Sequence, residues 1–191
     1  MAVTIGINGF GRIGRYLTRL LASDPDITLM AINARADNAQ LAHLLKYDSV
    51  HGRFAGTVKP CDEGLVINDK LVKITRHGGG EWRWGECGCR YVVETTGKFV
   101  DRESCEKHQC SGAERVIISA PGKNEDVTIV MGVNDHELKP EHRIISNASC
   151  TTNCLAPIAK AIYDNFGLKH GLMTTIHSFT MSQRILQGSH K

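Results

Sequence analysis

Residues 3–14 have the sequence VTIGINGFGRIG, in which a short apolar run leads directly into three glycines. The run predicts a strand, and leucines at helical spacing up to residue 21 predict a helix after the glycines. Gly9 permits a tight turn, Gly11 lets the backbone approach a pyrophosphate, and Gly14 lets helix and strand pack closely. The free N–H groups at the start of the helix favour an anion. The stretch therefore predicts a dinucleotide-binding turn.

The coenzyme depends on the end of a second expected strand, residues 27–33. In NAD-binding units an acid usually ends that strand and binds the ribose 2′-hydroxyl. Here Ala34 holds the place, with Arg35 beside it. Without a carboxylate, a 2′-phosphate is not repelled, and a guanidinium can pair with it. This indicates NADP or weak discrimination. The alternative is that Arg35 points to solvent and Asn33 alone serves the ribose, so the cofactor is NAD or NADP.

The next segments predict the rest of a sheet. Two β-rich runs flank Asn68-Asp69, a pair typical of a hairpin turn. Parallel strands are expected over residues 91–95, 115–120, 127–133 and 143–147, with a helix beginning near Asp101. Thr96, Gly97 and Ser119 fall at strand ends, where ligands of such sheets bind. The pattern predicts an α/β fold: a Rossmann-type, doubly wound, mainly parallel sheet over residues 1–148, followed over residues 149–191 by the start of an α+β catalytic domain.

Composition excludes several classes of protein. The chain has 191 residues, 41% hydrophobic and 23% charged, which is ordinary for a globular protein. It contains no apolar run of the roughly 20 residues that a membrane-spanning helix needs. The net charge of +3 is scattered along the chain, so nucleic-acid binding is not expected as a main role. The seven cysteines are irregularly spaced and predict free thiols in a reducing, cytoplasmic compartment rather than a metal site.

The strongest chemical signal is residues 149–154, SCTTNC, between an expected strand and a helical pattern. Cys150 is therefore expected at a helix N-terminus, where the dipole favours the thiolate. The hydroxyls of Ser149 and Thr151 can cap the helix or hold an anion. Cys154 is expected to be a small buried core residue. His177 is expected to end a later strand, residues 172–176, and a cysteine brought next to a histidine makes an activated nucleophile.

Four stretches in chain order resemble phosphorylating glyceraldehyde-3-phosphate dehydrogenase: NGFGRIGR (8–15), LKYDS (45–49), ASCTTN (148–153) and TIH (175–177). The resemblance implies oxidation of glyceraldehyde 3-phosphate, with inorganic phosphate, to 1,3-bisphosphoglycerate. It implies that Cys150 attacks the aldehyde and that His177 takes protons and steadies the adduct. It also implies a homotetramer.

The resemblance also assigns binding residues by position. Arg12 and Ile13 would meet the pyrophosphate and Asn33 the adenosine ribose, while Arg76, Thr96 and Ser119 would meet the rest of the coenzyme. Ser149 and Thr151 would bind the attacking phosphate, and Thr180 the substrate phosphate. With the residues at the glycine turn and strand ends, the cofactor-binding candidates are Asn8, Gly9, Gly11, Arg12, Ile13, Asn33, Ala34, Arg35, Arg76, Thr96, Gly97 and Ser119.

The chain departs from the family's pattern in three ways. Ala34 replaces the acid typical of NAD-specific members, Phe179 stands where a tyrosine is usual, and the chain resembles little more than the first half of a member. We therefore expect a fragment whose helix after Cys150 exposes an apolar face. A separate C-terminal fragment of the same protein is one expected partner. Two other functions stay open, an erythrose 4-phosphate dehydrogenase and a non-catalytic nucleotide-binding fragment.

Overall fold

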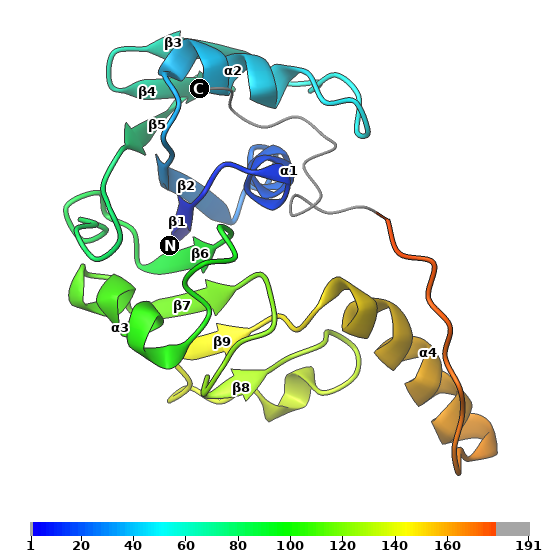
Figure 1. Cartoon of the computed structure of the whole chain (residues 1–191). Helices are drawn as coiled ribbons and strands as arrows, with labels where there is room; N and C mark the ends of the chain where they lie inside the picture. The colour runs from blue at the N-terminus through cyan, green and yellow to red at the C-terminus, as the bar shows by residue number, and fades with distance from the viewer. Residues whose placement is uncertain (1, 179–191) are drawn as a thin grey trace.

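The computed structural model describes residues 2–178, which form a large sheet flanked by helices (Figure 1). The strands in chain order are β1 (Val3–Asn8), β2 (Ile27–Asn33), β3 (Val58–Cys61), β4 (Gly64–Ile67), β5 (Lys70–Thr75), β6 (Tyr91–Glu94), β7 (Arg115–Ile118), β8 (Val127–Thr128) and β9 (Ile144–Ser146). The helices are α1 (Arg12–Leu21), α2 (Asn38–Lys46), α3 (Arg102–Cys110), the 3₁₀ turn η1 (Asp135–Glu137) and α4 (Cys150–Phe166).

The strand order confirms the predicted doubly wound sheet. Along the sheet the order is β3-β4-β5-β2-β1-β6-β7-β9-β8, and every pair from β5 to β8 is parallel. Within this register Asn8 pairs with both Asn33 and Glu94, which end the neighbouring strands. The carboxyl ends of the parallel strands therefore meet at one edge of the sheet, where such folds bind ligands.

The antiparallel hairpin at the far edge is also as predicted. Strands β4 and β5 pair directly up to Ile67 and Lys70, on either side of the two turn residues. Asn68 and Asp69 have φ angles of 47° and 64°. Both residues thus adopt the left-handed conformation of a type I′ turn, which suits the twist of the flanking strands.

Apolar side chains fill both faces of the sheet. On one face, strand residues such as Ile7 and Ile32 pack with Leu41 and Leu45 of α2, and all four are at most 2% exposed. A second cluster contains Trp84, which is 1% exposed, together with Trp82, Val92 and three smaller residues. Burial of this much apolar surface is the main force that holds the strand ends in register.

One predicted strand is shorter than expected, and another is absent from the described residues. The strand expected over residues 127–133 stops at Thr128, because the Asn134 side chain accepts from Val130 N at 2.9 Å and donates to the Thr128 carbonyl at 3.0 Å, closing a turn. The segment 172–176 forms no strand with any of residues 2–178. Its apolar side chains Leu172 and Ile176 are fully exposed.

Helix α4 projects away from the sheet (Figure 1). Within the described chain none of its residues is buried, and Phe166 is 86% exposed. This matches the expected exposure of an apolar face. Cys154, expected in a core, is instead exposed, because the helix that carries it packs against no other element of residues 2–178 closely enough to bury it.

Candidate active site

The glycine turn between β1 and α1 leaves room for a ligand. Gly9 has a φ of +102°, which disfavours any residue with a side chain. A Cβ on Gly14 would lie 2.3 Å from the Gly9 carbonyl oxygen, so Gly14 permits the close packing of helix and turn. A Cβ on Gly11 would have no atom of the described residues within 4 Å. Gly11 therefore faces open space at the start of the helix.

The start of α1 also has the charge that an anion requires. Gly11 caps the helix without a side chain, and the first turn holds no acidic residue. The first-turn N–H groups and the helix dipole therefore present positive charge to the open space. Arg12 Nη1 is buried and has no hydrogen-bond partner among residues 2–178. The site thus fits the pyrophosphate of a dinucleotide. Arg12 and Ile13 begin the helix at this site, and their contacts with the pyrophosphate stay predictions.

The Asn33 side chain is fully engaged within the protein. Its Nδ2 donates to Asn8 Oδ1 at 2.9 Å and to the His77 carbonyl at 3.2 Å. Its Oδ1 accepts from Thr75 Oγ1 at 3.0 Å and from His77 N at 2.9 Å. An amide has two donor hydrogens and two acceptor sites, so none is left over. The predicted contact of Asn33 with the ribose stays a prediction, and a contact through its side chain requires one of these bonds to be exchanged.

The residues after β2 form an open surface on which basic side chains stand beside the carboxylates of Asp37 and Asp62. Ala34 is buried and Arg35 is exposed. Arg76 Nη2 donates to the Ala36 carbonyl at 2.8 Å and to Asn38 Oδ1 at 2.7 Å. Arg76 and the first residues of α2 line a shallow hollow of about 480 Å³. Two guanidinium groups therefore stand near the strand end at which the sequence predicts the ribose.

The remaining coenzyme candidates follow the next strands. Thr96 and Gly97 lie two and three residues after the end of β6, and Gly97 has a φ of +70°. The Ser119 N–H donates to the Glu94 carbonyl at 3.0 Å. The residue that sequence reasoning missed here is Glu94, which is 1% exposed and binds Thr96. The feature of the sequence that could have indicated Glu94 is a carboxylate at the end of an otherwise apolar strand.

The structure brings Cys150 and His177 together. Cys150 Sγ lies 3.2 Å from His177 Nε2, and His177 Nδ1 lies 2.5 Å from the Ser178 carbonyl oxygen. Because a carbonyl only accepts, Nδ1 carries a proton and Nε2 faces the thiol. The hydrogen bond with His177, with help from Thr151, lowers the pKa of Cys150. The Ser178 carbonyl, and then Cys150, raise the pKa of His177.

The position of Cys150 follows from the local fold. Ser149 is the N-cap of α4, and its Oγ accepts from Thr152 N at 2.9 Å. Cys150 is thus the first residue of the helix, as predicted, and follows β9 at the same edge of the sheet as the glycine turn. Thr151 lies beside it in the first turn. Thr180, predicted to bind the substrate phosphate, lies outside the described residues.

Comparison with protein families identifies the chain. The model described as "Glyceraldehyde 3-phosphate dehydrogenase, NAD binding domain" matches residues 3–102, and the model of the C-terminal domain matches residues 149–191. The chain belongs to the glyceraldehyde-3-phosphate dehydrogenase family. This confirms the resemblance seen in the sequence. The match to the family's NAD-binding domain supports NAD as a coenzyme.

Named members of the glyceraldehyde-3-phosphate dehydrogenase family align along nearly the whole chain. The enzyme of Geobacillus stearothermophilus is 54% identical over 193 residues, which cover 100% of this chain and 58% of that protein. Enzyme 1 of Bacillus subtilis (strain 168) is 49% identical with the same coverage. That of Thermotoga maritima is 47% identical over 98% of this chain and 57% of its own length. The chain thus spans less than two thirds of these relatives.

Two further features concern residues 2–178 alone. In this part of the chain no helix combines the length and apolar character needed to cross a membrane. The same residues contain no group of three or more His, Cys, Asp or Glu side chains placed to hold a metal ion.

Proposed function

We propose that the protein carrying this chain oxidises glyceraldehyde 3-phosphate, in the presence of inorganic phosphate as second substrate, to 1,3-bisphosphoglycerate, with NAD or NADP as hydride acceptor. The observation that carries the proposal is the contact of 3.2 Å between Cys150 Sγ and His177 Nε2 at the first turn of α4. Membership of the family and the open glycine turn support it.

The cysteine and histidine account for the chemistry on the aldehyde. The Cys150 thiolate forms a bond to the carbonyl carbon as the C=O π bond breaks, and the carbonyl oxygen takes the developing negative charge, which the N–H of protonated His177 stabilises. The Nε2 proton of His177 then passes to this oxygen and leaves the imidazole neutral. The resulting thiohemiacetal gives up its hydroxyl proton to His177 Nε2 as the C–H hydride departs. The bound nicotinamide supplies the hydride acceptor. The product on Cys150 is a thioester, at the oxidation level of an acid.

Phosphate then completes the reaction. A phosphate oxygen attacks the thioester carbon, the C–S bond breaks, and Cys150 leaves as the thiolate that its lowered pKa favours. We assign the hydroxyls of Ser149 and Thr151, which flank the nucleophile at a helix N-terminus, to this phosphate. Thr180 is proposed for the substrate's own phosphate.

For the coenzyme, we propose that NADP is accepted beside NAD. Ala34 presents no carboxylate to a 2′-phosphate, and Arg35 is exposed beside it. The Asn33 side chain already makes four hydrogen bonds, so it has no free group with which to bind a 2′-hydroxyl. The guanidinium of Arg76 at the same strand ends adds positive charge.

We further propose a homotetramer in the cytoplasm, completed by the part of the catalytic domain that lies beyond this chain, on the same or a separate polypeptide. The apolar face of α4, with Leu155, Ile158 and Ile162 at least 40% exposed, supports a covering partner. All seven cysteines are free thiols, which suits a reducing compartment.

The test uses the full-length protein that contains this chain. Initial rates with glyceraldehyde 3-phosphate are measured with NAD and with NADP, with phosphate and with phosphate omitted. We expect turnover that requires phosphate, with values of kcat/KM for the two coenzymes within about tenfold of each other. A higher kcat/KM on erythrose 4-phosphate overturns the substrate, turnover without phosphate overturns the phosphorolysis, and a large preference for NAD overturns the coenzyme proposal.

A further inference from the structure

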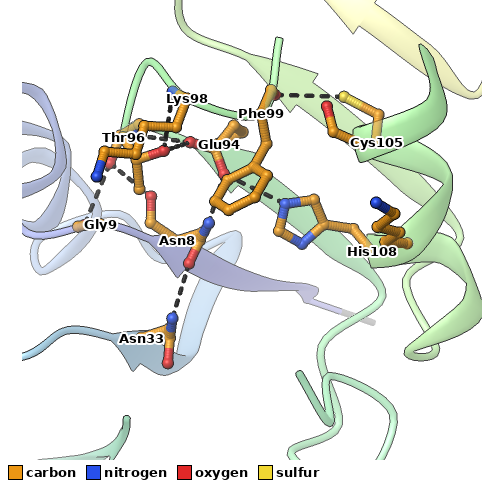
Figure 2. Close-up of polar contacts among 12 residues, drawn as sticks. Asn8, Gly9, Asn33, Glu94, Thr96, Lys98, Phe99, Cys105 and His108 are labelled. Carbon is orange, nitrogen blue, oxygen red and sulfur yellow. Dashed lines mark hydrogen bonds and ion pairs between the residues drawn. The ribbon is translucent and has the colours of Figure 1, made fainter. Parts of the chain in front are cut away.

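A buried carboxylate lies under the coenzyme site. Glu94, at the end of β6, is 1% exposed and meets four donors (Figure 2). Its Oε1 accepts from Thr96 N at 2.6 Å and from the Thr96 hydroxyl. Its Oε2 accepts from Asn8 Nδ2 at 2.5 Å and lies 3.2 Å from His108 Nε2. Two carboxylate oxygens offer about four acceptor sites, so the carboxylate is saturated.

The proton on His108 can be assigned from its other partner. Trp84 Nε1 lies 2.9 Å from His108 Nδ1, and an indole N–H is a donor only. His108 Nδ1 is therefore unprotonated, and Nε2 carries the hydrogen that is donated to Glu94. The imidazole is thus neutral and stacks on Trp82 with ring centroids 3.7 Å apart. The charge of Glu94 is consequently met by neutral N–H and O–H donors.

Glu94 sets the orientation of two amide side chains. Because Asn8 Nδ2 donates to Glu94, Asn8 Oδ1 faces the other way and accepts from Asn33 Nδ2 at 2.9 Å. Asn33 Oδ1 in turn faces Thr75 and the His77 N–H (3.0 and 2.9 Å). A flip of Asn8 would place its carbonyl oxygen against the carboxylate. The negative charge of Glu94, at the end of β6, therefore fixes the orientation of the side chains that end β1 and β2.

The same region holds the glycine turn. Thr95 Oγ1 donates to the carbonyls of Asn8 and Gly9 at 2.9 and 3.1 Å, so the turn after β6 is tied to the turn after β1. Glu94 holds Thr96 through the N–H and the hydroxyl of Thr96. A displacement of Thr96 therefore moves the adjacent Thr95, and with it Gly9, the first glycine of the turn. These bonds are only partly buried, whereas the bond between the buried side chains of Asn8 and Glu94 is the costly one to lose.

We propose that Glu94 is a positioning residue for coenzyme binding. It touches no coenzyme itself and acts by fixing Asn8 and Thr96, and through Asn8 the Asn33 amide, in the arrangement that the coenzyme meets. The inference rests on the assignment of these three residues to the coenzyme site under the proposed function. Coenzyme affinity, rather than the chemistry at Cys150, is the property that Glu94 controls.

The test is direct binding of NAD and NADP to the full-length protein, measured by calorimetric titration. Glu94→Gln keeps the size of the side chain but turns an amide NH₂ toward donors, and we expect Kd to rise about tenfold or more. Glu94→Asp keeps the charge, and its Kd should lie between those of the original protein and Glu94→Gln. At saturating coenzyme, the KM for the aldehyde should stay within about twofold of the original value. Should Glu94→Gln not fold, Glu94→Asp decides alone by the same two readouts.

Trp84→Phe provides the matched control, because it removes the donor at the other end of the network and leaves Glu94 in place. We expect it to lower Tm while Kd changes by less than about twofold. The proposal is overturned if Glu94→Gln binds coenzyme like the original protein, or if its Kd rises no more than that of Trp84→Phe at an equal loss of Tm. A protein that binds coenzyme but fails to oxidise glyceraldehyde 3-phosphate would refute the proposed function, while the ratio of Kd values would still test Glu94.

Discussion

Cys150 Sγ and His177 Nε2 lie 3.2 Å apart although 27 positions separate the two residues in the chain. The Ser178 carbonyl holds the proton on His177 Nδ1, which leaves Nε2 to take the proton of the thiol. The shifts in pKa are reciprocal, downward for the thiol and upward for the imidazole. The pair is therefore biased toward thiolate and imidazolium.

Replacing His177 should make Cys150 an ordinary thiol. With His177→Gln the hydrogen bond to the thiolate is lost, so the pKa of Cys150 rises and its alkylation profile moves to higher pH. At neutral pH we expect labelling by iodoacetamide to slow about tenfold or more. Mass spectrometry of labelled peptides measures the rate, with the exposed Cys110 as internal reference. An unchanged profile for Cys150 would show that His177 does not activate it.

Alanine substitutions of the two glycines at the start of α1 should affect different properties, stability at Gly14 and coenzyme affinity at Gly11. Gly14→Ala places a Cβ 2.3 Å from the Gly9 carbonyl, so we expect a loss of stability of about 1–3 kcal/mol. Gly11→Ala meets no atom of the described residues, and its φ of −75° suits alanine. We expect Gly11→Ala to keep its Tm but to bind coenzyme about tenfold more weakly, since the methyl enters the pyrophosphate space. Normal coenzyme affinity in Gly11→Ala would contradict the site.

Ala34→Asp should restore discrimination between the coenzymes. A carboxylate at the end of β2 repels a 2′-phosphate and can bind a 2′-hydroxyl. We expect kcat/KM with NADP to fall at least about tenfold while kcat/KM with NAD is kept or rises. Arg35→Gln is the matched variant, and it should lower only the value for NADP. Equal losses with both coenzymes would mean that the substitution disturbs the fold instead.

Asp126 should stabilise the fold in a pH-dependent way. Burial opposes its ionisation, but the hydrogen bond from Arg102 and the N–H groups of Ile144 and Arg143 outweigh it and lower the pKa of Asp126 to about 2. Its stabilisation is therefore complete above the unfolded pKa of about 4 and is lost as pH falls through about 2. We expect Asp126→Asn to lower the free energy of unfolding by about 1–2 kcal/mol at pH 7, with the difference shrinking below pH 4.

Denaturant titrations of the full-length protein at several pH values measure this effect. Asp164→Asn is the control, because the exposed pair of Asp164 with Lys160 should contribute less than about 0.5 kcal/mol. A loss in Asp126→Asn that stays constant from pH 7 to pH 2 would rule out the ionised carboxylate as its source.

Short-range patterns account for the features that the sequence predicts well. A strand, a glycine turn and a helix within residues 3–21, the left-handed pair Asn68-Asp69, and the helices that begin after Asp101 and Ser149 all depend on interactions between near neighbours. The strand expected over residues 172–176 is wrong because apolar composition alone does not supply a partner strand.

The sequence by itself therefore determined the fold class, because glycine conformation, helix capping and apolar periodicity act over a few residues. The resemblance of four short stretches indicated the family, which the comparisons confirm, and it is the basis for proposing Cys150 as the nucleophile. Only the tertiary structure decided that His177 reaches Cys150, that Asn33 has no free hydrogen-bonding group, and that Glu94 joins three strand ends. Contacts of this kind join residues distant in the chain, and their geometry depends on strand order and register, which local propensity does not encode.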